Sequence, residues 1–167
     1  MKEELYVQYE RAAAEFTGLL SWFDQVQINT VPGAGSWTAA QVGIHVLKSN
    51  KSIAQALTME AQPADRLPDE RVGELEAVFL NFETKLKSPD FILPEAGNYK
   101  KEKLAADLET SIEELKTRSK NVSLSGAIRH IAFGDITKLE LMHFVVFHTR
   151  RHSRQLRNIQ ALLKNQR

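Results

Sequence analysis

Histidines are the residues of this chain best suited to chemistry: His45, His130, His143, His148 and His152. The last two are four positions apart, so on a helix their imidazoles project from one face about one turn apart. This spacing lets a helix hold one metal ion through two nitrogens. His45 has a comparable inward position on another predicted helix, so three imidazoles would converge if the two helices are neighbours.

The same histidines could instead be packing residues. A single core-facing histidine is more often hydrogen-bonded to its surroundings than bound to a metal, and a pair four apart also arises by chance. Burying three polar rings without partners would, however, cost about 1–3 kcal/mol each, and a cation is one partner that removes this cost. The residues alone therefore leave both a metal site and a packing role open.

The other two histidines are not assigned to this cluster. His143 precedes His148 by five residues, which on a helix turns it about 140° away, so it is expected to face outward or toward a partner. His130 lies in an irregular segment before Gly134. It has no predicted ligand role, although it could lie near the mouth of a pocket.

Two helices are predicted in the first 60 residues, and the second carries His45. Apolar residues recur at steps of three and four from Leu5 to Val26, as one face of a helix requires. Thr38 and Gln41 have the spacing of a capping box, in which each side chain binds the other residue's backbone N–H at a helix start. The apolar stripe that follows includes His45, so this residue is expected to face the interior.

Three further helices are predicted after residue 70. A short one is expected over about 70–87, and a long one ends near Asn121. The last helix opens with a second capping box, formed by Thr137 and Glu140, and carries both His148 and His152. The segment from 88 to 98 is expected to be a loop.

The prolines and the helix count predict the fold class. All five prolines lie between positions 32 and 94, so both ends of the chain are free to form long helices. We therefore predict an all-α fold, a four-helix bundle with a long crossover containing an extra short helix, over a single domain of residues 1–167. The segment from Gly126 to Gly134 is expected to be irregular, with room for one more helical turn, and no strand is predicted.

Composition excludes several kinds of site and partner. The chain has 22 lysines and arginines against 21 acidic residues, which gives no reason to expect nucleic acid or an anionic membrane surface. It has no cysteine, so disulfides, thiolate metal sites and cysteine nucleophiles are excluded. Neither a signal peptide nor a membrane-spanning run is recognisable, so a cytoplasmic protein is expected.

Three segments together resemble the DinB-like family of metal-binding four-helix bundles. They begin with a tryptophan-led helix start and end with an H-x3-H-x2-Q pattern, and they cover residues 37–45, 133–137 and 148–156. The resemblance extends over nearly the whole chain in helix order and length. It implies a divalent metal, zinc or nickel first, held by His45, His148 and His152. The family includes bacillithiol S-transferases and proteins regarded as metal-dependent hydrolases, and its members are often homodimers.

Three functions remain as hypotheses. No glutamate lies between His148 and His152 to act as a general base, which favours transfer of a low-molecular-weight thiol to a small electrophile. The alternatives are metal-dependent hydrolysis and a non-catalytic stress-response helical binding module. Gln155 and Ser49 are candidates for orienting the ligands from outside. A homodimer is also predicted, with two final-helix residues expected to be exposed at its contact: Phe144 and Phe147.

Overall fold

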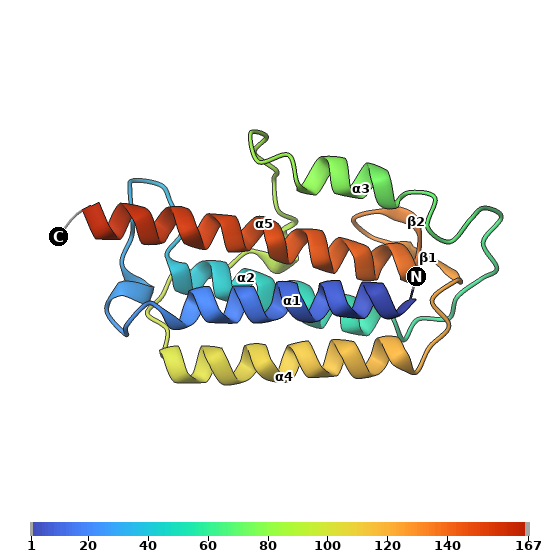
Figure 1. The fold of residues 1–167 in the computed structure, drawn as a ribbon, viewed down its shortest axis with the longest axis horizontal. Helices are drawn as coiled ribbons and strands as arrows, with labels where there is room; N and C mark the ends of the chain where they lie inside the picture. Colours follow the sequence, from blue (N-terminus) through green and yellow to red (C-terminus); the bar gives the residue numbers. More distant parts are fainter. Residues whose placement is uncertain (1, 166–167) are drawn as a thin grey trace.

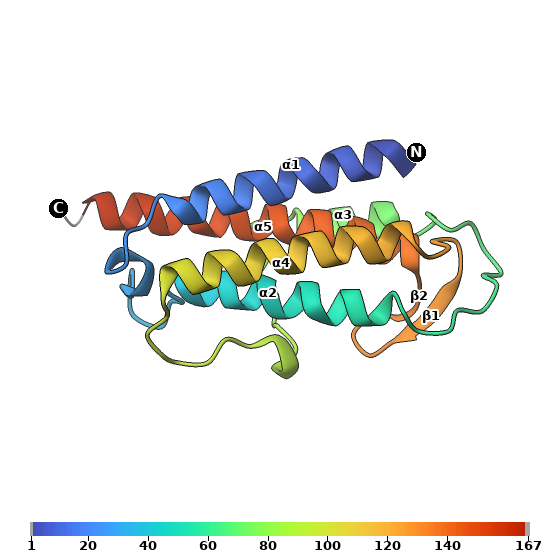
Figure 2. The ribbon, with the colours of Figure 1, turned by 90° about the horizontal axis from the view of Figure 1, so that it is seen from below.

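Four long helices lie side by side along the length of the molecule (Figures 1 and 2) in a computed structural model that describes residues 2–165. They are α1 (Lys2–Ser21), α2 (Ala39–Ala56), α4 (Lys101–Lys120) and α5 (Lys138–Asn165). The connection between α2 and α4 contains the short helix α3 (Val72–Phe79), which packs on α5 from outside the bundle. The predicted all-α four-helix bundle with an extra helix in its crossover is confirmed.

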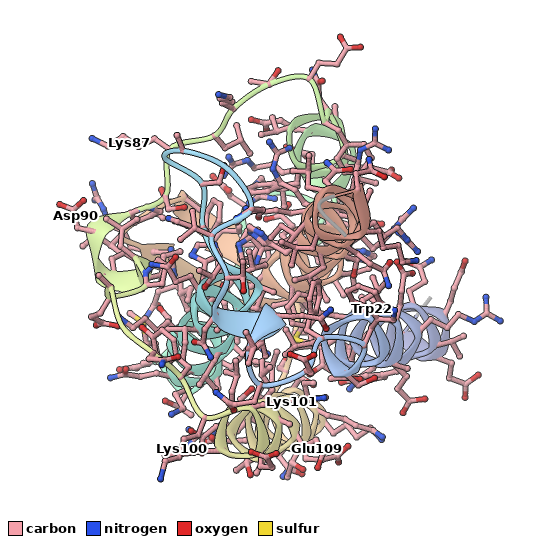
Figure 3. The ribbon with its side chains drawn as sticks, turned by 90° about the vertical axis from the view of Figure 1, so that its left-hand side faces the viewer. Trp22, Lys87, Asp90, Lys100, Lys101 and Glu109 are labelled. Carbon is pink, nitrogen blue, oxygen red and sulfur yellow. The ribbon has the colours of Figure 1, made fainter. Side chains whose placement is uncertain are left out.

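The bundle packs α1 against α5 and α2 against α4, with α2 and α5 also in contact. Viewed along its length, the second half of the crossover, marked by Lys87 and Asp90, lies on the opposite side of the molecule from Trp22 at the end of α1 (Figure 3). The short helices η1 (Gln27–Asn29) and η2 (Asp90–Ile92) lie in the connections. Within residues 2–165, no helix combines the length and hydropathy that crossing a bilayer requires.

Both predicted capping boxes are present, and they fix the starts of the two helices that carry the candidate site. The Gln41 backbone N–H donates to the Thr38 hydroxyl at 3.1 Å, and the Thr38 N–H donates to the Gln41 side chain at 3.0 Å. Glu140 and Thr137 form the same reciprocal pair at 3.1 and 2.9 Å. Each box satisfies two backbone donors that have no partner within the helix.

The first helix ends earlier than its apolar spacing predicts. It stops at Ser21, and Val26, the last member of the predicted stripe, is 75% exposed. The Asp24 carboxylate accepts hydrogen bonds from the backbone N–H groups of Val26 and Gln27. A local aspartate turn therefore replaces the helical hydrogen bonds at this point.

The prediction that no strand follows α4 is wrong. Two antiparallel strands, β1 (Ala127–His130) and β2 (Gly134–Thr137), form a hairpin. Each strand has four residues, too short for an alternating pattern to be detected, and the buried pair Ile128 and Ile136 holds the hairpin on the bundle. Gly134 has a φ of +65°, a conformation that glycine adopts with little strain.

The crossover helix is also shorter than predicted. It ends at Phe79 rather than near residue 87, and two apolar residues within the predicted range, Phe82 and Leu86, are exposed. The Arg151 side chain donates hydrogen bonds to the backbone carbonyls of Phe79, Asn81 and Thr84. A partly buried arginine side chain thus satisfies carbonyls that would otherwise require further helical turns.

The expectation that Phe144 and Phe147 are exposed is wrong as well. They are 5% and 4% exposed, and α1, α2 and α3 all contact α5. Phe144 meets the Phe79 ring edge to face at 4.9 Å between centroids. The homodimer stays a prediction, without these two residues as its contact.

A buried carboxylate joins the crossover, the hairpin and α5. The Glu140 side chain is fully buried and accepts hydrogen bonds from the Arg66 guanidinium and from the backbone N–H groups of Arg71 and Thr137. Burial alone would raise the pKa of Glu140, but these hydrogen bonds together lower it.

Replacing this carboxylate should therefore destabilise the whole fold. We expect Glu140→Ala to cost on the order of 3 kcal/mol, because it leaves the Arg66 charge and two backbone donors without their partner. Thermal unfolding should show a Tm lower by about 6–12 °C. The matched control is Glu114→Ala, which removes an exposed pair with Arg118 and should change the Tm little. Equal effects of the two substitutions would contradict this role for Glu140.

Candidate metal centre

Three imidazoles meet in the interior, one from α2 and two from α5. The Nε2 atom of His148 lies 3.0 Å from that of His45 and 3.1 Å from that of His152. One ligand atom from each of the three rings lies within 4.8 Å of the other two, and all three residues are buried. The structure thus brings together the residues that the sequence placed on two inward-facing helix stripes.

Hydrogen bonds fix the orientation of two of these rings. The Nδ1 atom of His45 lies 2.9 Å from the backbone carbonyl oxygen of Ile92, and that of His152 lies 2.8 Å from Oε1 of Gln155. An oxygen of this kind only accepts, so each Nδ1 carries the ring proton and donates it. In a neutral ring Nε2 then has a free lone pair, and both lone pairs are directed toward the common centre.

This arrangement is unsatisfied without a cation. If His45 and His152 both present lone pairs, only His148 could carry a proton at Nε2, and it could donate that proton to one neighbour only. At least one close nitrogen pair would still lack a shared proton. A metal ion accepts all three lone pairs, so the donor set fits a metal.

The distances also suit a small divalent ion. Tetrahedral zinc with Zn–N bonds of about 2.0–2.1 Å places its ligand nitrogens roughly 3.3 Å apart. Two of the three nitrogen pairs, at 3.0 and 3.1 Å, are slightly closer than this, and all three ligand atoms lie within 4.8 Å of one another. Three protein ligands leave at least one coordination position open, as in catalytic rather than structural sites.

Burial keeps the three imidazoles neutral, the form that binds a metal. It is the largest cause in each case: it lowers the pKa of His152 to about 3 and that of His148 well below the usual range. The pKa of His45 is lowered less, because the Ile92 carbonyl stabilises the protonated ring. Mutual repulsion among the rings adds to the lowering for His148 and His152.

The two residues proposed to orient the ligands have different positions. Gln155 contacts His152 directly through the hydrogen bond described above. Ser49 forms no hydrogen bond with a triad histidine and instead lines a neighbouring pocket. The orienting group for His45 is the carbonyl of Ile92, which sequence reasoning missed. No signal could have identified it, since every residue type has a backbone carbonyl.

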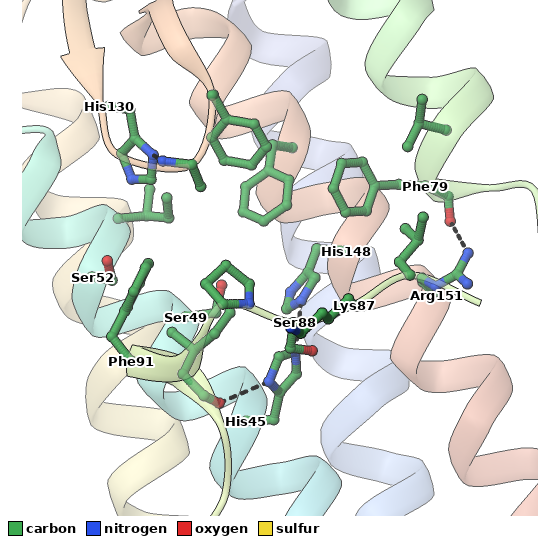
Figure 4. Close-up of a pocket in the computed structure, with 18 residues that line it drawn as sticks. His45, Ser49, Ser52, Phe79, Lys87, Ser88, Phe91, His130, His148 and Arg151 are labelled. Carbon is green, nitrogen blue, oxygen red and sulfur yellow. Dashed lines mark hydrogen bonds between the residues drawn. The ribbon is translucent and has the colours of Figure 1, made fainter. Parts of the chain in front are cut away.

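A pocket of about 240 Å³ opens beside the triad (Figure 4) and reaches His45 and His148. Its walls are mainly apolar and come from α2, α3, α5, the crossover and the hairpin. Among the aromatic and aliphatic residues that line it are Ile53, Phe79, Phe91, Ile92, Phe133 and Phe144. No aspartate or glutamate is among the described residues of its wall.

The remaining two histidines lie apart from the triad. His130, at the end of β1, lines the same pocket on another side. His143 lies on a different face of α5, in a groove that also contains Gln8 of α1 and Val72 of α3. Its direction away from the triad agrees with the rotation predicted from its spacing.

Comparisons with known proteins agree with this fold. The solved structure of TT2238, described as a four-helix bundle protein, superimposes with a TM-score of 0.62 over 95% of this chain and 99% of that one. Its sequence is 17% identical, so the likeness concerns the fold alone. No curated protein matches the chain. The sequence model of the DinB superfamily matches residues 8–156, which is most of the chain, and the protein therefore belongs to the DinB superfamily.

Proposed function

We propose that this protein holds a divalent metal, zinc or nickel, through His45, His148 and His152, and catalyses transfer of a low-molecular-weight thiol to a small electrophile. The observation that carries the proposal is the convergence of three buried Nε2 atoms beside an apolar pocket whose described wall has no carboxylate. Imidazole ligands accept either metal, and cellular availability decides between them.

A divalent ion at this position would lower the pKa of a thiol beside it and so keep the sulfur nucleophilic at neutral pH. The chain contributes the rest. Ile92 and Gln155 hold two ligand rings with their Nε2 atoms directed inward. The apolar walls exclude water and accommodate the body of the electrophile.

Thiol transfer requires little proton chemistry from the protein. The thiolate sulfur attacks an electrophilic carbon and forms a C–S bond, while the leaving group departs with the bonding electron pair. The thiol proton has already passed to solvent, so no side chain has to remove it during the attack. A pocket without carboxylates is sufficient for this reaction.

Hydrolysis would make greater demands on the same pocket. It benefits from a general base that removes a proton from the attacking water. The described wall provides no aspartate or glutamate. The three buried rings of the triad would serve as metal ligands and so would not be free to act as the base. We therefore favour thiol transfer over hydrolysis and over a non-catalytic binding role.

Metal analysis combined with a thiol assay tests the proposal. Protein purified without a histidine tag should contain close to one divalent ion per chain, and His45→Ala and His148→Ala should lose it. Wild type should accelerate consumption of bacillithiol or cysteine by 1-chloro-2,4-dinitrobenzene in a metal-dependent way, and both variants should lose this acceleration. The control His143→Ala, on the same helix as His148 but outside the site, should keep metal and activity.

Each of the other hypotheses has its own signature in this experiment. Product formation from a model ester that persists without thiol would favour hydrolysis. Loss of metal with a lower Tm, and no turnover in wild type, would indicate a non-catalytic module. Full metal content in both alanine variants would overturn the metal site itself.

The Gln155 contact provides a finer test of the centre. Gln155→Leu removes the acceptor that orients the His152 ring, and we expect metal affinity to fall about tenfold. A competition titration with a chromogenic chelator measures this change. Gln160→Leu, on the same helix, is the matched control and should leave the affinity unchanged. An equal loss in both variants would mean that the effect is not specific to the hydrogen bond.

Acid should destabilise the metal-free protein through the same histidines. Their folded-state pKa values lie below the ordinary 6.5, so the unfolded chain takes up protons first as the pH falls below 6.5. For His152, with a pKa of about 3, the loss is about 1.4 kcal/mol per pH unit in that window. Urea unfolding at pH 7.5 and 5.5 should show a smaller loss for His152→Gln than for wild type; equal losses would contradict this account.

A further inference from the structure

His130 lines the pocket, and its neutral ring has one hydrogen-bond donor. Its Nδ1 atom lies 3.1 Å from the backbone nitrogen of Ala132, whose N–H donates to it. Because an amide N–H cannot accept, Nδ1 holds a lone pair, and the proton of the neutral ring is on Nε2. Burial lowers the pKa of His130, which keeps the ring neutral at pH 7.

The ring is held firmly in this position. It stacks at a tilt on Phe133, with 5.1 Å between centroids, and the residue is buried. Its backbone pairs with Gly134 across the hairpin, where the turn returns toward α5. Among the residues that the structure describes, none forms a hydrogen bond with Nε2. The donor is therefore oriented in advance but has no protein acceptor.

The geometry places this donor away from the metal ligands. Figure 4 shows His130 on the other side of the pocket from His45 and His148, with apolar side chains between them. The cations of the wall do not compete with it: Arg151 is bound to three backbone carbonyls, and Lys87 is exposed at the rim. A ligand spanning the pocket would thus meet the triad at one end and a neutral N–H at the other.

We infer that His130 is a specificity-determining residue whose Nε2–H binds an uncharged oxygen acceptor, such as a ketone or amide carbonyl, on the part of the electrophile remote from its reacting carbon. The substrate class is a small, neutral molecule with an aromatic or aliphatic body and one such oxygen. This inference rests on the proposed function for the reacting end only. The carbonyl preference of His130 is independent of whether a thiol or water attacks.

A neutral donor suits a neutral acceptor. An isolated carboxylate in this apolar end would lose its hydration and gain only one uncharged partner, which is unfavourable. A ketone loses less hydration, and one hydrogen bond from a fixed donor replaces it. Because the contact is remote from the reacting atoms, its loss should raise KM and leave kcat nearly unchanged.

The experiment compares two probes of nearly the same shape, acetophenone and ethylbenzene. Only acetophenone has an oxygen acceptor, and both are small enough for a pocket of about 240 Å³. NMR titrations of the full chain, as purified and again after chelation of any metal, give both dissociation constants. No thiol is present, so the result does not depend on turnover.

Two substitutions separate the two ring nitrogens. His130→Asn keeps an acceptor near the Nδ1 position for the Ala132 N–H but has no donor at the Nε2 position, whereas His130→Gln offers an amide N–H there. We expect His130→Asn to weaken acetophenone binding about 3–10-fold and ethylbenzene binding less than twofold. His130→Gln should recover most of the acetophenone affinity. In wild type, the ¹⁵N signal of His130 Nε2 should shift with acetophenone and not with ethylbenzene.

The inference would be overturned if His130→Asn weakened the binding of both probes equally or left acetophenone binding unchanged. It would also be overturned if wild type bound neither probe, or if the ¹⁵N signal of His130 Nε2 did not shift with acetophenone. The wild-type Nε2 signal decides the matter even if a variant fails to fold. If these binding tests failed while metal binding and thiol turnover were intact, only the role of His130 would be rejected. Selective binding of acetophenone without thiol turnover would instead support the role of His130 as a hydrogen-bond donor and reject thiol transfer.

Discussion

Two hydrogen bonds, one to Nδ1 of His45 and one to Nδ1 of His152, determine which ring nitrogens of the triad are left with a free lone pair. Ile92 and Gln155 each accept the Nδ1 proton of a triad histidine, which directs two Nε2 lone pairs at a common centre. His148 can share a proton with only one of its two neighbours at 3.0 and 3.1 Å, so at least one of these close nitrogen pairs is left without a hydrogen bond. The interior therefore holds a polar cluster that a bound cation would satisfy, and the bundle around it maintains that arrangement.

The bundle achieves this by fixing where two helices begin. The capping boxes of α2 and α5 set the first turn of each helix. Helical periodicity then directs the side chains of His45, His148 and His152 toward the interior. Glu140 ties the α5 start to the crossover and to the hairpin. The same residues that begin the helix thus also hold the segments that line the pocket.

The parts of the fold predictable from sequence are those governed by local periodicity and capping. The four long helices, both caps and the inward direction of His45 could be predicted because each depends on residues within a few positions of one another. The hairpin, the early end of α3 and the burial of Phe144 could not. Each depends on a distant partner: the pairing of Ile128 with Ile136, the Arg151 side chain, and the packing of α3 on α5. For the same reason the contact of the Ile92 carbonyl with His45 could not be predicted, whereas a place for His130 near a pocket was considered from the sequence and agrees with the structure.

Ile92 belongs both to the wall of the pocket and to the support of His45. Any movement of the crossover that widens the pocket would also withdraw the acceptor that fixes this imidazole. If the triad binds a metal ion and the pocket binds a ligand, the two binding events would therefore be thermodynamically coupled through one peptide group. A ligand that keeps the crossover in place would strengthen metal binding, and by reciprocity the bound metal would favour the ligand to the same degree.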